Sequence, residues 1–241
     1  MEITFIGSGD AFGSGGRLQT CILINTENLI AAVDFGATSL TGLRSRGIDP
    51  NSISVLLISH LHGDHCGGVP FLLLDAITSS KRKEPLTIIG PEGTEKYIYN
   101  LWEALYPGSS SMQPDFQIEF LEIEPSGQLR YKDFIISAIK AKHSIESNPL
   151  ALKISVEDKV IVYTGDGAPT DKLVDFTENA DIAVAECFSY SEKSEMHSNY
   201  MDVKHLKAKK LILTHMNRDM LSYTDKVPEL CAYDGLKVEI Q

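Results

Sequence analysis

Residues 59–68 of this chain read Ser-His-Leu-His-Gly-Asp-His-Cys-Gly-Gly, so three imidazoles and a carboxylate fall within six positions. They follow directly on the apolar residues 55–58, which predict a buried strand that delivers these side chains at its carboxyl end. Clustered imidazoles are costly to bury without a partner, and imidazole with carboxylate is a ligand set for zinc, iron or manganese. The segment therefore predicts a metal site rather than a polar surface loop.

The spacing within this segment predicts more than one ion. Side chains alternate along an extended chain, so His60 and His62 share one face and could bind a single ion. Gly63 then lets the chain turn, which leaves Asp64 and His65 to address a different position. One four-coordinate ion could not readily use all these groups together with ligands from later in the chain. We therefore expect two adjacent metals.

Further polar side chains lie at the carboxyl ends of later predicted strands. Strands that run into short loops along one rim are a recurring way to assemble a cleft. Four segments have this form: His143 follows 134–141, Asp166 follows 160–163, Glu186 follows 182–185 and His215 follows 211–213.

The pattern His60-x-His62-x-Asp64-His65, followed by His143, Asp166 and His215, resembles the signature of the metallo-β-lactamase-fold hydrolases. The resemblance covers essentially the whole chain. It implies an α/β fold, a four-layer αββα sandwich of two mixed β-sheets flanked by helices, with residues 1–241 as a single domain.

The resemblance also implies how the metals are held. One ion is expected on His60, His62 and His143, the other on Asp64, His65 and His215, with Asp166 as the bridge. Two divalent ions per chain, Zn²⁺ or else Mn²⁺ or Fe²⁺, would then activate a bridging hydroxide at neutral pH.

Four positions favour the ribonuclease Z-like or phosphodiesterase branch of this superfamily. Members that reduce oxygen carry Glu where His62 stands, and many zinc β-lactamases carry a cysteine ligand where Asp166 stands. Glu186 and His197 match a Glu–His pair of ribonuclease Z, in which the histidine protonates the departing oxygen. Phosphodiester cleavage needs such an acid because an alkoxide is a poor leaving group. The resemblance therefore implies Asp64, Glu186 and His197 as catalytic residues.

The substrate stays open at this point. Ribonuclease Z enzymes that process tRNA often carry a long, basic, glycine-rich arm between the positions of His143 and Asp166, where this chain has only a predicted hairpin. Small cyclic-phosphodiester hydrolases of the same fold also lack the arm, so both a small nucleotide and an RNA 3′ end remain candidates. Hydrolysis of a small ester, thioester, lactone or lactam is a second hypothesis, and a non-catalytic metal-binding protein is a third.

Charge and composition limit the partners. The 22 Lys and Arg residues against 33 Asp and Glu residues give a net charge of −11, so any role on nucleic acid needs a local positive site. No apolar run approaches the ~20 residues of a membrane-spanning helix, so no membrane partner is expected. Four scattered cysteines and the absence of a signal segment favour free thiols and a cytoplasmic location. A homodimer is compatible with the sequence.

Other segments give weaker expectations. The glycine-rich loop 7–17 lacks the spacing of a nucleotide-binding fingerprint, so its backbone is expected to approach the cleft, with Arg17 as a candidate substrate-binding residue. Three further predictions concern structure: antiparallel strands over 116–124, 128–131 and 134–141, a helix over 199–208, and solvated side chains at Lys81, Arg82 and Lys83.

Overall fold

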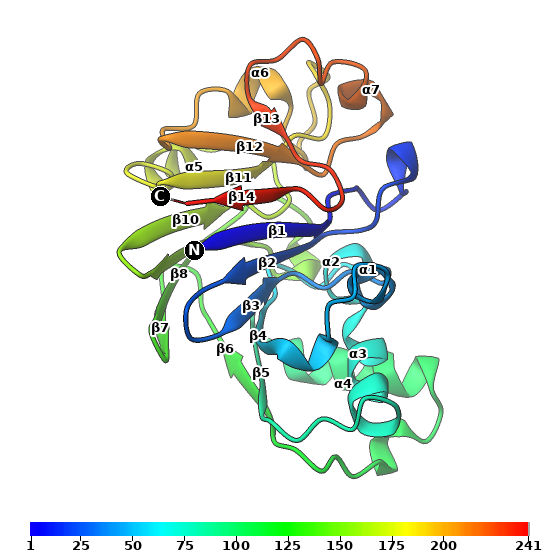
Figure 1. Ribbon diagram of the computed structural model, residues 1–241. Coiled ribbons are helices and arrows are strands. Elements are labelled where there is room, and N and C mark those ends of the chain that lie inside the picture. Colours follow the sequence, from blue (N-terminus) through cyan, green and yellow to red (C-terminus); the bar gives the residue numbers. More distant parts are fainter. Residues whose placement is uncertain (241) are drawn as a thin grey trace.

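The computed structural model describes residues 1–240, and two mixed β-sheets pack face to face at its centre (Figure 1). The first sheet has the order β14-β1-β2-β3-β4-β5-β6. Its strands are β1 (Glu2–Gly7), β2 (Cys21–Asn25), β3 (Ile30–Val33), β4 (Ile53–Leu57), β5 (Leu86–Gly90), β6 (Ile118–Glu122) and β14 (Lys237–Glu239).

The second sheet has the order β13-β12-β11-β10-β9-β8-β7. Its strands are β7 (Gln128–Tyr131), β8 (Phe134–Lys140), β9 (Leu150–Val156), β10 (Lys159–Tyr163), β11 (Ile182–Glu186), β12 (Lys210–Thr214) and β13 (Leu230–Cys231). In both sheets one half is antiparallel and the other half, from β3 to β6 and from β10 to β13, is parallel.

Helices cover the outer faces of the sheets, which completes the four-layer αββα sandwich and confirms the predicted fold class (Figure 1). The α-helices are α1 (Ser39–Ser45), α2 (Gly63–Cys66), α3 (Val69–Thr78), α4 (Thr94–Leu105), α5 (Asp171–Phe176), α6 (Tyr200–Val203) and α7 (Arg218–Leu221). Short 3-10 segments are η1 (Ser14–Gly16), η2 (Pro50–Ser52), η3 (Ser109–Ser111) and η4 (Ile145–Ser147).

The strand before the histidine motif is buried on both of its faces. Val55 and Leu57 point into the core between the two sheets, whereas Leu56 packs beneath the helices α3 and α4. Burial on two faces is typical of parallel strands and explains why this strand is a continuous apolar run. The histidine motif therefore begins from a rigid, fully buried element.

One predicted strand was wrong in its pairing. The segment 116–124 does not pair antiparallel with 128–131; β6 runs parallel to β5 in the first sheet instead. The helix α4 connects β5 to β6, and a crossover through a helix returns the chain parallel to its starting strand. The chain then passes to the second sheet, where β7 and β8 are antiparallel as predicted, and β9 pairs antiparallel with β8.

The helix predicted over 199–208 is much shorter than expected. It ends at Val203, because the backbone N–H groups of Lys207 and Lys209 bind Thr177 Oγ1 and Ala180 O and so turn the chain into β12. The elements α2, α5, α7, β13 and β14 were not predicted from the sequence.

The basic run 81–83 is only partly solvated. Arg82 is buried, contrary to the prediction, and its guanidinium donates to the carbonyl oxygens of Glu84, Ile53 and Pro85 at 2.6–2.8 Å. It therefore stabilises a loop rather than offering a free positive charge.

The cysteines and helices agree with two other expectations. Cys21, Cys66, Cys187 and Cys231 carry free thiols. Within residues 1–240, no helix is long and apolar enough to cross a bilayer.

Candidate metal centre

The carboxyl ends of strands from both sheets meet at one edge of the sandwich, and all seven predicted ligand residues lie there. Their potential ligand atoms form two groups, each with its atoms within 4.8 Å of one another. The first group is His60, His62 and His143; the second is Asp64, His65, Asp166 and His215. The two groups combine residues that are up to 155 positions apart in the sequence. Backbone hydrogen bonds between the sheets, such as Leu150 N to Ser59 O at 3.0 Å, help to hold these residues together. Their role as ligands stays a prediction.

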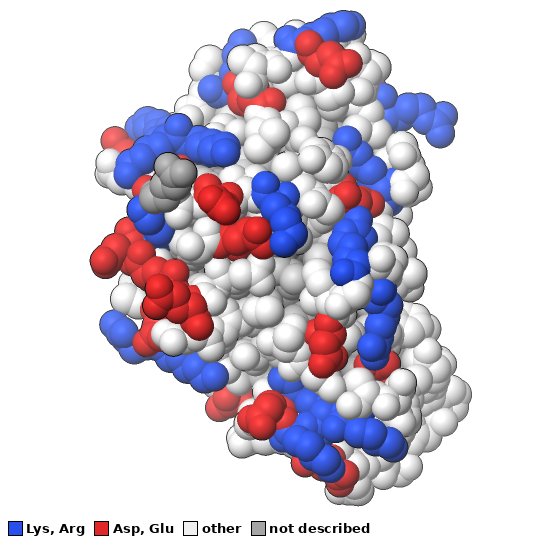
Figure 2. Space-filling view, in the orientation of Figure 1, with Lys and Arg blue, Asp and Glu red and all other residues white. Residues whose placement is uncertain are grey.

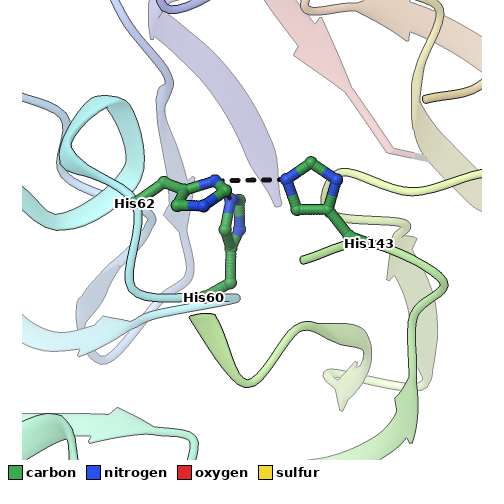
Figure 3. Close-up of side chains that lie close together, drawn as sticks. All are labelled: His60, His62 and His143. Atoms are coloured by element: carbon green, nitrogen blue, oxygen red, sulfur yellow. Dashed lines mark hydrogen bonds between the residues drawn. The ribbon is translucent and has the colours of Figure 1, made fainter. Parts of the chain in front are cut away.

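The first group brings three imidazole nitrogens together (Figure 3). His62 Nδ1 lies 3.1 Å from His60 Nε2 and 3.1 Å from His143 Nε2. Nitrogens bound to one tetrahedral zinc at 2.0–2.1 Å are separated by about 3.3–3.4 Å. The observed spacing therefore fits a single ion held by three imidazoles.

Hydrogen bonds orient two of these rings. The Ser59 hydroxyl donates its only proton to Asp34 Oδ2 at 2.8 Å, so it can only accept from His60 Nδ1 at 3.0 Å. His143 Nδ1 donates to Met196 O at 2.6 Å. Both rings thus carry their proton on Nδ1, and each directs an unprotonated Nε2 at His62.

The protonation state of the first group also suits a metal. Burial, followed by the neighbouring imidazoles, holds the pKa of His60 well below its ordinary value, and burial lowers the pKa of His62 and His143 as well. Neutral imidazole is the form that binds metal ions. Three nitrogen lone pairs converging on one point, with at most one proton available among them, favour a cation there.

The second group surrounds Asp64 and Asp166 with two imidazoles. Asp64 Oδ2 lies 3.2 Å from His215 Nε2 and 3.3 Å from His65 Nε2, while Asp166 lies 3.4 Å from the same two nitrogens. His65 Nε2 and Asp166 Oδ1 are buried without a hydrogen-bond partner. An imidazole nitrogen and a carboxylate oxygen that face one another in a buried site without hydrogen bonds fit a divalent cation between them.

Carboxylates shift the imidazoles of this group in the opposite direction from the first. Burial lowers the pKa of His215, but Asp166 and Asp64 outweigh it and raise the pKa to about 9. A proton on this ring compensates part of the buried negative charge that a metal ion would otherwise compensate.

Asp34 is the functional residue that the sequence did not single out. It ends β3 with φ of 56°, a left-handed conformation that Asp and Asn adopt more readily than most residues. Its Oδ1 accepts from Ser59 N at 2.8 Å, and its Oδ2 accepts from Ser59 Oγ and from His65 Nδ1 at 2.7 Å. A carboxylate that holds His65 directly and His60 through Ser59 is a typical partner of metal-binding histidines. In the sequence, the one signal for this role of Asp34 was its position at the end of a strand beside β4.

We predict that Asp34→Asn lowers metal affinity by about 10–100-fold, the usual cost of losing such a partner. The asparagine amide would donate to His65 Nδ1, which moves the ring proton to Nε2, the atom that faces the cluster. Competition with a chromogenic chelator measures the affinity. Because Asn tolerates the backbone conformation, the melting temperature should fall less than in Asp34→Ala. Unchanged affinity in both variants would contradict the role of Asp34.

Glu186 and His197 lie together beside the second group. His197 Nδ1 donates to Glu186 Oε1 at 2.5 Å, and Glu186 Oε2 accepts from the backbone of Gly167 and Ser198 at 2.9 and 3.0 Å. The His197 ring stacks on Phe188 with 4.6 Å between centroids and lies 5.0 Å from His143. Burial lowers the pKa of His197, but the hydrogen bond and charge of Glu186 outweigh it, so the pKa is raised.

The glycine-rich loop reaches the site as expected, whereas Arg17 is engaged elsewhere. Gly9 forms an isolated β-bridge with Met216, the residue after His215. A Cβ at Gly7 would lie 1.9 Å from Gln19 O, so this close backbone approach requires glycine. Arg17 Nη1 donates to Ala232 O at 2.6 Å. Its role as a substrate-binding residue stays a prediction.

A four-layer αββα sandwich with this histidine and aspartate edge defines a metallo-β-lactamase-fold protein. A family model described as "Anti-Pycsar protein Apyc1" matches residues 1–230, and the chain belongs to this family. The chain is a metal-dependent hydrolase of the ribonuclease Z-like branch.

Individual relatives agree with this assignment. Ribonuclease Z of Pyrococcus horikoshii is 24% identical over 287 aligned positions, which cover 96% of this chain and 92% of the relative. The short form of human tRNase Z superposes with a TM-score of 0.80, 22% identity and 100% coverage of both chains. The metallo-β-lactamase-fold protein YhfI of Bacillus subtilis gives a TM-score of 0.77, 20% identity and 99% coverage of both chains.

Proposed function

We propose that the chain is a phosphodiesterase whose two divalent metal ions, zinc in the first instance, are held by the seven residues of the two groups. The observation that carries this proposal is the Glu186–His197 pair beside the metal centre. Cleavage of an alkyl phosphodiester expels an alkoxide and needs an acid near the departing oxygen. The pair supplies such an acid and, together with the ribonuclease Z relatives, favours phosphodiester chemistry over hydrolysis of an ester, thioester, lactone or lactam.

His197 is suited to donate a proton. Its Nδ1 is taken by Glu186, and its Nε2 has no hydrogen-bond partner among residues 1–240. Because Glu186 raises the pKa of His197, the ring keeps a proton on Nε2 up to a higher pH than an ordinary histidine. Glu186 does not reach the substrate in this account; it orients the ring and stabilises its positive charge.

Asp64 is suited to the other proton transfer. Its Oδ2 faces His65 and His215, whereas its Oδ1 has no hydrogen-bond partner in the described chain, residues 1–240. That second oxygen can accept the proton of an attacking water. Bound between Asp64 and the imidazoles, divalent ions would lower the pKa of a water and stabilise negative charge on the phosphoryl group. Asp166, which contacts both His65 and His215, is the proposed bridge.

The substrate proposal has two forms. The ribonuclease Z relatives favour an RNA substrate, for which an RNA 3′ end is the first candidate, because their name describes a ribonuclease. A small cyclic phosphodiester is the second candidate, because only η4 and the hairpin β9–β10 lie between His143 and Asp166. The alignment with the Pyrococcus enzyme, 287 positions, is longer than this chain of 241 residues, so that relative carries insertions that this chain lacks. Acidic and basic side chains are interspersed on the face in Figure 2, which shows no broad basic surface for tRNA. The proposed location is the cytoplasm. The seven proposed ligands come from one chain, so the proposed reaction does not require a dimer.

A side-by-side assay of the metal-loaded protein tests this function. We predict hydrolysis of bis(p-nitrophenyl) phosphate and of a 3′,5′-cyclic nucleotide or an RNA with a 3′ extension. A thioester and a β-lactam should be turned over at least about 100-fold more slowly, because the proposed site stabilises negative charge on a phosphoryl group, which neither of them carries. Faster turnover of either of these two would replace the proposal with the ester or lactam alternative.

A further inference from the structure

We propose that Asp234 is a positioning residue, which holds the second metal group in place through the backbone of His215. The inference rests on the proposed function, in which His215 is a metal ligand, and adds a residue from outside the ligand set. Asp234 lies between β13 and β14, 19 positions after His215 in the sequence. Its carboxylate reaches His215 through the glycine-rich loop, by way of Ser8.

The ring of His215 depends on its backbone for its orientation. The three other ligand histidines that direct Nε2 at the cluster each hydrogen-bond through Nδ1, as described above. Within residues 1–240, His215 Nδ1 is buried without a hydrogen-bond partner, and Glu186 Oε1 lies 3.8 Å from it. A ring without such a hydrogen bond is oriented by the position of its own Cα and by the packing around it.

That backbone has an uncommon conformation, which the glycine-rich loop holds. His215 has a φ of 56°, a left-handed conformation that side-chain-bearing residues keep only where their surroundings hold it. His215 N donates to Ser8 O at 3.0 Å, and Thr214 Oγ1 donates to the same oxygen at 3.3 Å. The bridge between Gly9 and Met216 fixes the next residue. The loop therefore sets the direction in which β12 delivers His215.

Asp234 holds both ends of this loop. Its Oδ1 accepts from Ser8 N at 2.9 Å and from Ser8 Oγ at 2.8 Å, and its Oδ2 accepts from Leu18 N at 2.8 Å. Leu18 O in turn accepts from Gly9 N at 2.7 Å. Hydrogen bonds to a carboxylate are stronger than those between neutral groups. Without this carboxylate, Ser8 N and Leu18 N lose their acceptor, and the loop is free to move away from β12.

The segment that carries Asp234 is itself fixed at both sheets. Ala232 N donates to Leu213 O of β12 at 2.7 Å. Gly235 N donates to Phe5 O of β1 at 2.7 Å. The segment thus ties the second sheet to the first where β1 ends and the glycine-rich loop begins (Figure 1). A carboxylate on such a segment is a fixed point from which the loop can be held.

Zinc titration of the metal-stripped protein, measured by competition with a chromogenic chelator, tests the effect on the metal centre. In Asp234→Ala, one of the two ions should bind at least about tenfold more weakly, as is usual when a group that orients a ligand is lost. The other should keep its affinity, because the first group comes from the loops after β4 and β8. In a His215→Ala background, Asp234→Ala should not change the affinity of the remaining ion, because both changes act through the same residue.

Hydrogen exchange of the metal-free protein tests the first step without any ion. The backbone N–H of His215 should exchange at least about tenfold faster in Asp234→Ala, because its acceptor on Ser8 is released. Asp234→Asn keeps one acceptor oxygen for Ser8 and should show both the weaker ion and the faster exchange, each to a smaller extent. This milder variant gives the same test if Asp234→Ala does not fold.

Asp181→Ala is the matched control. Asp181 is also a partly buried carboxylate that accepts from a backbone N–H, that of Val160 at 2.8 Å, but it lies before β11, at the other end of this strand from Glu186. This variant should lose stability while both zinc affinities and the exchange of His215 stay as in the wild type.

Unchanged zinc affinities or unchanged exchange of His215 in the Asp234 variants would overturn the positioning role, and so would equal changes in Asp181→Ala. The proposed function fails by a different result, a wild-type protein that binds fewer than two zinc ions or hydrolyses no phosphodiester in the assay above. The exchange measurement uses no metal and no substrate, so it distinguishes the two failures.

Discussion

Replacing His197 with alanine should lower kcat on an alkyl phosphodiester by roughly 10²–10⁴-fold, the usual range for lost general-acid catalysis. The reason is that His197, held by Glu186, supplies the proton that the departing alkoxide requires. With p-nitrophenolate, which leaves readily without a proton, the same variant should lose much less. Steady-state kinetics on both substrates, with metal content measured in parallel, gives the comparison.

His205 provides the control for this prediction, since it is an exposed histidine nearby in the sequence. His205→Ala should behave as wild type on both substrates. Equal losses on the two leaving groups in His197→Ala, or no loss on either, would mean that His197 is not the acid.

Glu186→Gln adds a pH signature to the same argument. Activity on the alkyl substrate requires protonated His197, so kcat should fall as pH rises through its pKa. The carboxylate of Glu186 raises that pKa, and the amide would not. The alkaline limb of the profile should therefore move to lower pH in the variant, while the loss of kcat at acidic pH stays smaller than in His197→Ala.

Replacing Asp166 with alanine should abolish phosphodiester hydrolysis and reduce bound metal from about two ions to less than one per chain, because a bridging carboxylate serves both sites. Asp166 is buried and contacts both His65 and His215. His215→Ala, in contrast, removes a ligand of the second group alone and should keep about one ion, on the three imidazoles of the first. Elemental analysis after reconstitution measures both.

Asp175→Ala is the matched control, because this carboxylate is exposed and pairs with Lys207 at the surface. It should keep full metal content and activity. If Asp166→Ala and His215→Ala lost metal equally, Asp166 would not be the bridge.

The candidate site could be read from the sequence because its residues belong to strand ends. The apolar run before His60 fixes where β4 ends, and the same rule located His143, Asp166, Glu186 and His215. The periodicity of apolar residues and the spacing of polar residues are local properties, so they can be recognised in the sequence alone. The sandwich of two mixed sheets came from the resemblance rather than from these local patterns.

What the sequence did not reveal depends on partners far along the chain. Asp34 looks like any polar residue at a strand end, and its function arises only when folding brings Ser59 and His65 to it. The pairing of β6 with β5, and the burial of Arg82 against three carbonyl oxygens, are likewise decided by tertiary contacts. Such contacts override local preference because each satisfies buried polar groups that otherwise carry a large penalty.

We propose above that two metal ions on this edge of the sandwich are required for phosphodiester hydrolysis. The most direct measurement strips the protein of metal and follows the hydrolysis of bis(p-nitrophenyl) phosphate as Zn²⁺ is added in known equivalents. We predict no activity in the stripped protein and a rise that saturates at about two equivalents per chain. Full activity without metal, or saturation at one equivalent with the second group empty, would contradict it.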